Sequence, residues 1–322
     1  MLLFGNQSTG LTAIYPLINQ ERWNLSIKGG VMSEIAVLKD IAYFGGGDGY
    51  FYAVNVNNGN VLWKVDLRTP FFAKPTFENH RVFIHTALGM VIAFDAQTGK
   101  RLWHYKRLLP GTPKLIGAGT PLISQDELIV GTSDGSVIAL HTNDGHLLWE
   151  KSLHNKTSSR FHDVQARAVL DNGILYIPAY DGALYAHRRS TRDILWRFDA
   201  GGAKSILIEK ERLFFPSSDG TIYALKKDNA QVLWKFQLDG GVPTPLESAN
   251  DYLLFGSSYQ FLYVLNKHTG EGLYRFHVGH NSGFTGSFAL DSGNSKLYAL
   301  SRSGNLYAFK IQKNVPTSFF DF

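Results

Sequence analysis

The sequence predicts an all-β repeat fold, and three observations lead to that prediction. Five of the six tryptophans follow a leucine directly, as at Leu62-Trp63 and Leu102-Trp103. Ten residues before each of these five, a small residue follows a bulky one, as at Tyr52-Ala53. The pattern recurs about every 40 residues, which is the length of a four-stranded propeller blade and exceeds a leucine-rich or ankyrin repeat. The small residues that mark it are Ala53, Ala93, Ala139, Ala186, Ala224, Val264 and Ala308.

The local sequence of each repeat indicates β-strands. Asp48-Gly49 and three similar Asp-Gly pairs supply the positive-φ residues of tight hairpin turns, and alternating apolar residues follow them. A second turn, Asn58-Gly59 in the first full repeat, comes just after the small-residue strand. Each repeat therefore predicts four strands: two apolar runs such as 35–38 and 41–44, then the small-residue strand, then the Leu-Trp strand.

The number of repeats predicts a seven-bladed β-propeller of four-stranded antiparallel blades. The chain begins with a Leu-Trp-type strand at Trp23–Ile27 and ends with a small-residue strand at Leu306–Phe309, and each lacks its own partners. We expect these two strands to pair in one blade and close the ring, because pairing removes two open sheet edges. The predicted division is an N-terminal extension at 1–19, a single propeller at 20–310 and a C-terminal tail at 311–322.

The repeat resembles the PQQ-like β-propeller repeat, which combines an Asp-Gly turn, a Tyr-Ala-Leu-Asp-like strand, a Thr-Gly turn and Leu-Trp. Residues 94–103, FDAQTGKRLW, match it closely, and the similarity covers about residues 20 to 310. The chain departs from the pattern at Arg192 and Ala230, where glycine is expected, and at Tyr259-Gln260, where Asp-Gly is expected. Tyr274 replaces the tryptophan of the sixth unit.

The recurring aromatic residues have two interpretations. They could stack on a planar ligand, but a residue repeated in every unit is better explained by a task that every blade shares. An indole buries on the order of 200 Å² and has one N–H that needs a partner, so we expect these residues to dock neighbouring blades. They are Trp23, Trp63, Trp103, Trp149, Trp196, Trp234 and Tyr274.

Composition excludes several classes of protein. The 322 residues are 44% hydrophobic and contain no cysteine, which excludes a disulfide scaffold, a zinc ribbon, an iron–sulfur site and a cysteine nucleophile. No run of about 18 apolar residues predicts a membrane-spanning helix. The net charge of +5 is too small to predict a nucleic-acid groove. Residues 1–8 lack a basic segment, so they predict neither a signal peptide nor a lipobox.

The candidate binding site lies on the connections between successive repeats, which frame the mouth of a propeller channel. These connections hold eleven Lys and Arg against five acids, so they carry the whole positive excess. Either they attract an anion, or they are ordinary solvated loops in which Asp163 serves as an internal counter-ion for the cations. The candidate residues are Lys74, Arg160, His162, Asp163, Arg167, Lys204 and Glu34.

Quinoprotein chemistry is a remote alternative. The resemblance implies that PQQ-dependent dehydrogenases of this repeat are longer, have eight blades and hold PQQ beside Ca²⁺ under a vicinal disulfide. Calcium requires six or more oxygen ligands, which Glu34 and Asp163 cannot supply, so no cofactor is expected. Neither His162-Asp163 nor the pair His277 and His280 has an obvious third ligand.

The leading hypothesis is a non-catalytic scaffold that binds partner proteins through its faces and mouth loops. It resembles the BamB-type propeller lipoprotein of the bacterial outer-membrane barrel-assembly machinery, which implies a periplasmic or other extracytoplasmic location. That family has eight blades and a lipidated cysteine, whereas seven blades are counted here. The alternative is a propeller enzyme or binding protein for an anionic small molecule or glycan in the channel. We expect a monomer without nucleic-acid binding.

Overall fold

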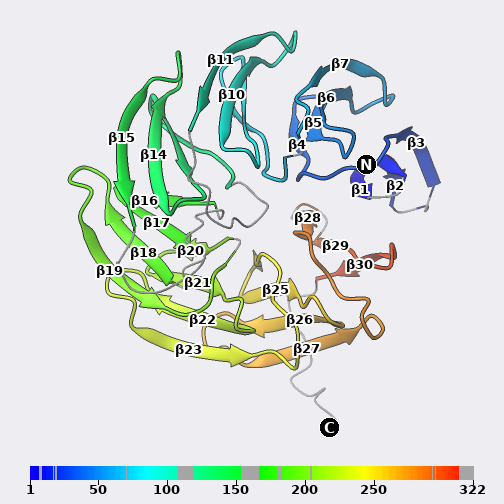
Figure 1. Ribbon diagram of the computed structural model, residues 1–322. Helices are drawn as coiled ribbons and strands as arrows, with labels where there is room; N and C mark the ends of the chain where they lie inside the picture. Colours follow the sequence, from blue (N-terminus) through cyan, green and yellow to red (C-terminus); the bar gives the residue numbers. More distant parts are fainter. Residues whose placement is uncertain are drawn as a thin grey trace. The chain divides into compact units, whose positions relative to one another are not determined.

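The structure is a computed structural model that describes residues 1–6, 9–16, 18, 20–69, 71–107, 119–153, 167–179, 183–203, 205–291, 293 and 295–311. These residues form antiparallel sheets in which the strands lie side by side in chain order (Figure 1). The chain divides into two compact units, Met1–Leu170 and Asp171–Phe322. We number the sheets as blades 1 to 8 along the chain and name the strands of a full blade A to D.

The first unit contains blades 1 to 4. Blade 1 consists of β1 (Leu2–Asn6), β2 (Gly10–Tyr15) and β3 (Gln20–Ser26). Blade 2 consists of β4 (Ala36–Leu38), β5 (Ile41–Gly45), β6 (Tyr50–Asn55) and β7 (Val61–Asp66). Blade 3 consists of β8 (Thr76–Glu78), β9 (Arg81–His85), β10 (Met90–Asp95) and β11 (Arg101–Lys106). Blade 4 consists of β12 (Leu122–Ser124), β13 (Glu127–Gly131), β14 (Ser136–His141) and β15 (Leu147–Ser152).

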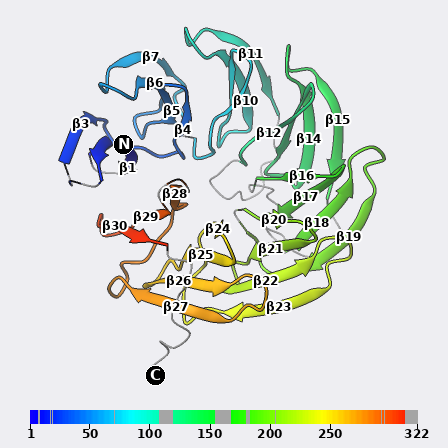
Figure 2. The ribbon, with the colours of Figure 1, turned by 180° about the vertical axis from the view of Figure 1, so that it is seen from behind.

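The second unit contains blades 5 to 8, which Figure 2 shows from behind. Blade 5 consists of β16 (Val169–Asp171), β17 (Ile174–Ala179), β18 (Ala183–Arg188) and β19 (Ile194–Asp199). Blade 6 consists of β20 (Leu207–Glu209), β21 (Arg212–Pro216), β22 (Thr221–Lys226) and β23 (Val232–Gln237). Blade 7 consists of β24 (Glu247–Ala249), β25 (Tyr252–Gly256), β26 (Phe261–Asn266) and β27 (Gly272–His277). Blade 8 consists of β28 (Ala289–Asp291), β29 (Lys296–Leu300) and β30 (Leu306–Lys310).

The predicted number of seven blades is therefore wrong, because the chain forms eight. The strand of Trp23 does not pair with the strand of Ala308: Trp23 lies opposite Ala13 on β2, and Ala308 lies opposite Tyr298 on β29. Residues 1–19, expected as an extension, supply β1 and β2 of blade 1. Within the described residues, blade 1 has only strands B to D and blade 8 only strands A to C.

The miscount has a local cause. Ala13 does lie ten residues before Trp23, but the residue before it is Thr12 rather than a bulky one. Thr12 is buried and accepts a hydrogen bond of 2.7 Å from Asn24 Nδ2 on the neighbouring strand. A polar cross-strand pair thus occupies the position that an apolar residue marks in the other repeats.

The register explains the ten-residue spacing. In blade 2, Ala53 on strand C lies opposite Trp63 on strand D, and the register shifts directly after Ala53. The same pairing and the same β-bulge occur in all seven described blades with a D strand, with Val264 opposite Tyr274 in blade 7. The bulge inserts one extra residue on strand D, which keeps the large ring facing the next blade.

Burial differs by strand position. In blades 2 to 7, strands B and C are buried almost along their whole length, as in β5 and β6. The D strands of blades 2, 4, 5 and 6 alternate between exposed and half-buried residues, as β7 does. Each D strand is the last strand of its sheet. The apolar core therefore lies between blades, and the D strands present an edge of exposed apolar and charged side chains.

Candidate functional site

Each blade has two ends. At one end lie the turn between strands B and C and the connection from strand D to strand A of the next blade. We call it the D–A end, and the opposite end, with the A–B and C–D turns, the C–D end. The seven candidate residues of the sequence were expected at the D–A end.

Three of the seven candidates lie in the described part of the chain, and Arg160, His162, Asp163 and Lys204 lie outside it. Glu34 is exposed, and its backbone N–H donates to Phe72 O at 3.4 Å. Lys74 is half-buried, and its N–H donates to Thr120 Oγ1 at 3.2 Å. Arg167 is exposed. Backbone bonds therefore join successive D–A connections of the first unit, but no convergent cluster of these three side chains is present.

Buried phenylalanines pack against the D–A ends of two blades. Phe71, on the connection after blade 2, is 1% exposed and packs over Gly45, the last residue of β5. A Cβ on Gly45 would lie 2.7 Å from Phe71 Cε1, so only glycine fits. In the second unit Phe284 covers Gly256 of β25 in the same way and is fully buried. These positions hold packing residues and offer no polar group to a ligand.

Arg107, counted in the positive excess, is neutralised by two acids. Its Nη2 lies 2.6 Å from Asp134 Oδ2 and 2.6 Å from Glu150 Oε1, and its Nε donates to Asp134 at 2.8 Å. The hydrogen bond from Arg107 lowers the pKa of Glu150. Burial raises the pKa of Asp134, but bonds from Thr132 and Arg107 outweigh it, so that pKa is also lowered. Arg107 is therefore a link between blades 3 and 4 rather than a free cation.

Exposed cations nevertheless remain at the D–A end of the first unit. The Arg68 side chain is 90% exposed, with Asp66 at 3.8 Å as a weak partner. Glu34 is an exposed acid of the same connections. Among the described residues, the exposed cations there are Lys28, Arg68, Lys106 and Arg167.

The C–D end carries inter-blade contacts that the sequence did not reveal. In each case the residue directly after strand C offers its carbonyl oxygen to the preceding blade. Ala96 O accepts from Trp63 Nε1 at 3.0 Å and from the Tyr43 hydroxyl at 3.0 Å. Thr142 O accepts from Trp103 Nε1 at 3.0 Å and from Arg81 Nη1 at 2.7 Å. Trp23 donates likewise to Val56 O, at 2.9 Å.

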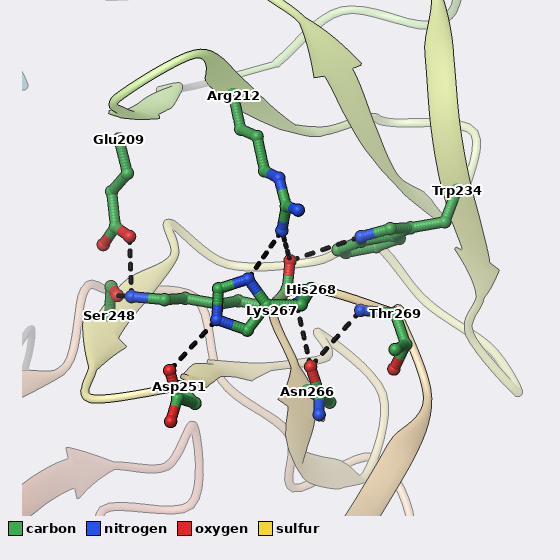
Figure 3. Close-up of polar contacts among 9 residues, drawn as sticks. All are labelled: Glu209, Arg212, Trp234, Ser248, Asp251, Asn266, Lys267, His268 and Thr269. Carbon is green, nitrogen blue, oxygen red and sulfur yellow. Dashed lines mark hydrogen bonds and ion pairs between the residues drawn. The ribbon is translucent and has the colours of Figure 1, made fainter.

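The second unit repeats this contact and adds side-chain bonds to it. Lys267 O accepts from Trp234 Nε1 at 3.3 Å and from Arg212 Nη1 at 3.2 Å (Figure 3). The Lys267 ammonium points back to blade 6 and lies 2.7 Å from Glu209 Oε2. Burial raises the pKa of Glu209, but the hydrogen bond from Lys267 outweighs it, so the carboxyl pKa is lowered. His268 connects Arg212 to Asp251 beside this pair.

Among the three remaining recurring aromatics, Trp196 follows this scheme. Trp196 Nε1 donates to Lys227 O at 3.1 Å, as does the Tyr176 hydroxyl at 3.2 Å. Trp149 Nε1 donates to Glu127 Oε1 of its own blade at 3.2 Å. Tyr274 is half-buried and packs against the core of blades 7 and 8.

A quinoprotein site does not fit the described residues. Among them, the only three-residue group of histidines and carboxylates with metal-binding spacing is His141, Asp144 and His146, at a C–D turn. Glu34 belongs to no such group. His277 and His280 lie ring to ring at 5.1 Å and have no third ligand within the described residues. A calcium ion needs more oxygen ligands than this set provides.

The blades, their register and their PQQ-like repeats together define a β-propeller repeat protein. The family model described as outer membrane protein assembly factor BamB matches residues 8–236 and 181–315. The chain therefore belongs to the BamB family of outer membrane protein assembly factors. Seven blades were predicted from the sequence, against the eight expected for this family. The structure has eight blades, so that difference disappears.

Individual relatives agree with this assignment. The chain is 28% identical to outer membrane protein assembly factor BamB of Shewanella oneidensis over 284 residues, which cover 84% of this chain and 69% of the relative. The crystal structure of BamB from Moraxella catarrhalis superposes with a TM-score of 0.80 at 18% identity, covering 96% of this chain and all of that one. Quinohemoprotein alcohol dehydrogenase from Comamonas testosteroni superposes with a TM-score of 0.69 at 12% identity, covering 89% and 67% of the two chains. That last likeness concerns the fold alone.

Proposed function

We propose that this chain is a non-catalytic scaffold of outer-membrane protein assembly that holds partner proteins at the D–A end of its blades. The match of the BamB family model to nearly the whole chain carries this proposal. The apolar filling around Phe71 and Phe284 supports it, because it replaces the convergent polar groups that an enzyme would need. No cofactor takes part in this function.

The contact surface that we propose lies on the first unit. Lys28, Arg68, Lys106 and Arg167 are exposed there, while Arg107 is used internally. An acidic segment of a partner protein is the complementary ligand, since charge complementarity guides association and fixes register. Lys74 and Glu34, with Arg160, His162 and Asp163, belong to the same proposed surface, whereas Lys204 belongs to the second unit and is not part of it.

The location follows from the function. Assembly of outer-membrane proteins takes place outside the cytoplasm, so we propose an extracytoplasmic protein. No helix in the described residues is long and apolar enough to cross a bilayer.

Charge reversal tests the proposal. Arg68→Glu and Arg101→Glu change the net charge equally, and both arginines are exposed in the first unit, but Arg101 begins β11 at the C–D end. Each variant is produced in a bacterium that lacks its own family member, and the levels of folded outer-membrane proteins are measured. We expect the unaltered chain and Arg101→Glu to restore assembly and Arg68→Glu to restore it less. Failure of the unaltered chain would refute the function, and equal activity of both variants would refute the surface.

A further inference from the structure

The C–D turn of blade 4 holds three ligand-type side chains on one short hairpin. His141 ends β14 and His146 precedes β15, with Asp144-Gly145 at the turn. The His141 N–H donates to His146 O at 2.9 Å, and the Gly145 N–H donates to His141 O at 2.9 Å. These backbone bonds place the two imidazoles on neighbouring strands, on either side of the Asp144 carboxylate.

The side chains converge on one point. Nδ1 of His146 lies 2.6 Å from Asp144 Oδ1, and Nδ1 of His141 lies 3.2 Å from the same oxygen. The two rings are stacked, with centroids 4.9 Å apart and planes 23° apart. One ligand atom from each of the three residues falls within 4.8 Å of the others. Two imidazole nitrogens and one carboxylate oxygen form a ligand set suited to zinc and its neighbours in the first transition row.

One side of the hairpin packs against blade 3, and the side that carries the ligand groups is open to solvent. The Trp103 ring of blade 3 packs on Gly145 and donates its N–H to Thr142 O at 3.0 Å. The side chains of His146 and Asp144 are 56% and 61% exposed. An incoming ion therefore meets prepositioned ligands, and water can complete its coordination sphere.

Folding of this hairpin does not require the imidazoles. The equivalent hairpin of blade 2 has asparagine at all three positions, Asn55, Asn58 and Asn60. Its backbone bonds are the same: Asn55 N–H to Asn60 O at 2.9 Å and Gly59 N–H to Asn55 O at 2.8 Å. The Asn60 N–H donates to Asn58 Oδ1 at 3.0 Å, as the His146 N–H does to Asp144 Oδ1 at 3.2 Å.

We propose that His141, Asp144 and His146 bind one divalent first-row transition-metal ion, of the series from Co²⁺ to Zn²⁺. Each imidazole offers Nδ1, and Asp144 exchanges its two histidine contacts for the ion. The site lies at the C–D end, away from the proposed partner-binding surface, and does not depend on the proposed function.

The blade 2 hairpin supplies a matched variant. Converting blade 4 to it with His141→Asn, Asp144→Asn and His146→Asn removes every ligand and keeps the turn chemistry. Calorimetric titration of the full chain with Zn²⁺ is expected to give one tight site in the unaltered protein, weakened about tenfold or more in the triple variant, since even indirect partners of metal ligands change affinity by that factor. His268→Asn, on the equivalent hairpin of blade 7, is expected to leave this site unchanged.

A spectroscopic measurement separates ligation from general attraction of cations. With one equivalent of Cu²⁺, electron paramagnetic resonance is expected to show nitrogen hyperfine coupling in the unaltered chain and to lose it in the triple variant. Absence of a tight site in the unaltered chain, or equal binding by the triple variant with an unchanged melting temperature, would overturn the proposal.

Discussion

The two compact units join neighbouring blades by the same backbone contact but support it differently. In the first unit the accepting carbonyls belong to Val56, Ala96 and Thr142, and a turn glycine lies under each tryptophan. In the second unit the acceptors are Lys227 and Lys267, whose ammonium groups also pair with Asp171 and Glu209 of the preceding blade. A backbone acceptor leaves the side chain free to vary. In the second unit both acceptor residues use that side chain for an ion pair, whereas the uncharged side chains of Val56, Ala96 and Thr142 form none. Ring packing on a turn glycine is common to both units, because Trp234 packs on Gly270.

The turn residues differ in the same direction. Gly59, Gly99 and Gly145 have φ between 71° and 76°. At two of the three equivalent positions of the second unit, Arg192 and Ala230 adopt φ of 63° and 60°, and Gly270 occupies the third with φ of 75°. The two departures from the expected glycine thus keep the left-handed turn at a cost of about 1 kcal/mol each.

The largest expected effect is loss of ring packing in the first unit. Trp103 is 8% exposed and lies between blades 3 and 4. Trp103→Ala is expected to lower the free energy of unfolding by about 3–5 kcal/mol, because it leaves a cavity and removes one of the two hydrogen bonds to the Thr142 carbonyl. Urea unfolding measures the loss. Leu102→Ala, at a neighbouring 41% exposed residue, is the control and should cost far less; similar losses would show that Trp103 does not dock the blades.

An intermediate effect is expected from the ion pair of the second unit. The Lys267 and Glu209 side chains are 15% and 30% exposed. Lys267→Met should lower the free energy of unfolding by about 1 kcal/mol, because Glu209 loses its partner while water still screens it partly. Adding Glu209→Gln should recover part of this loss.

Exposed Lys235 on β23 gives the control for that variant, since Lys235→Met removes the same charge without breaking this pair. The pair also predicts a dependence on pH. The carboxyl pKa of Glu209 is lowered in the folded chain, so the stabilisation is present at neutral pH and is lost as the pH falls through the folded pKa. A Lys267→Met chain with unchanged stability at neutral pH would contradict a role for the pair.

The smallest effect concerns the left-handed turn of blade 6. Ala230→Gly should raise the free energy of unfolding by about 0.5 kcal/mol, because relief of the positive-φ strain exceeds the added freedom of the unfolded chain. Gly99→Ala is the opposite change in the first unit and should destabilise, since its Cβ would lie 2.7 Å from the Trp63 ring. A stabilising Gly99→Ala would remove the distinction between the units.

The sequence allowed the repeat, the strand order and the family resemblance to be predicted, because they depend on short-range spacing. Blade 1 was not predicted, because Thr12 forms a polar pair with Asn24 at the position where the repeat pattern has an apolar residue. The hydrogen bonds between blades at the C–D ends could not be predicted from the sequence. Tyr43 and Arg81 donate to backbone carbonyls 53 and 61 residues away, and a residue of any type can supply such a carbonyl. Arg107 was counted as a loop cation because its partners are remote in sequence.

The proposed metal site on the C–D turn of blade 4 is only weakly indicated by the sequence. His141 and His146 flank an Asp-Gly turn, and a hairpin places residues on either side of such a turn next to each other. Blade 2 has three asparagines at the same positions, so the spacing alone does not predict a metal site. Only the pair of imidazoles with Asp144 between them distinguishes blade 4.

The exposed edge of each sheet also bears on how the protein behaves at high concentration. Every Leu-Trp strand has an exposed ionisable residue directly after its tryptophan: Lys64, His104, Glu150, Arg197 and Lys235. A foreign strand that adds to such an edge would bring its own side chains against these polar groups, which disfavours growth of a shared sheet. Each Leu-Trp strand therefore carries a polar group that opposes the addition of a foreign strand, and self-association through these edges should be reduced even when partners are absent.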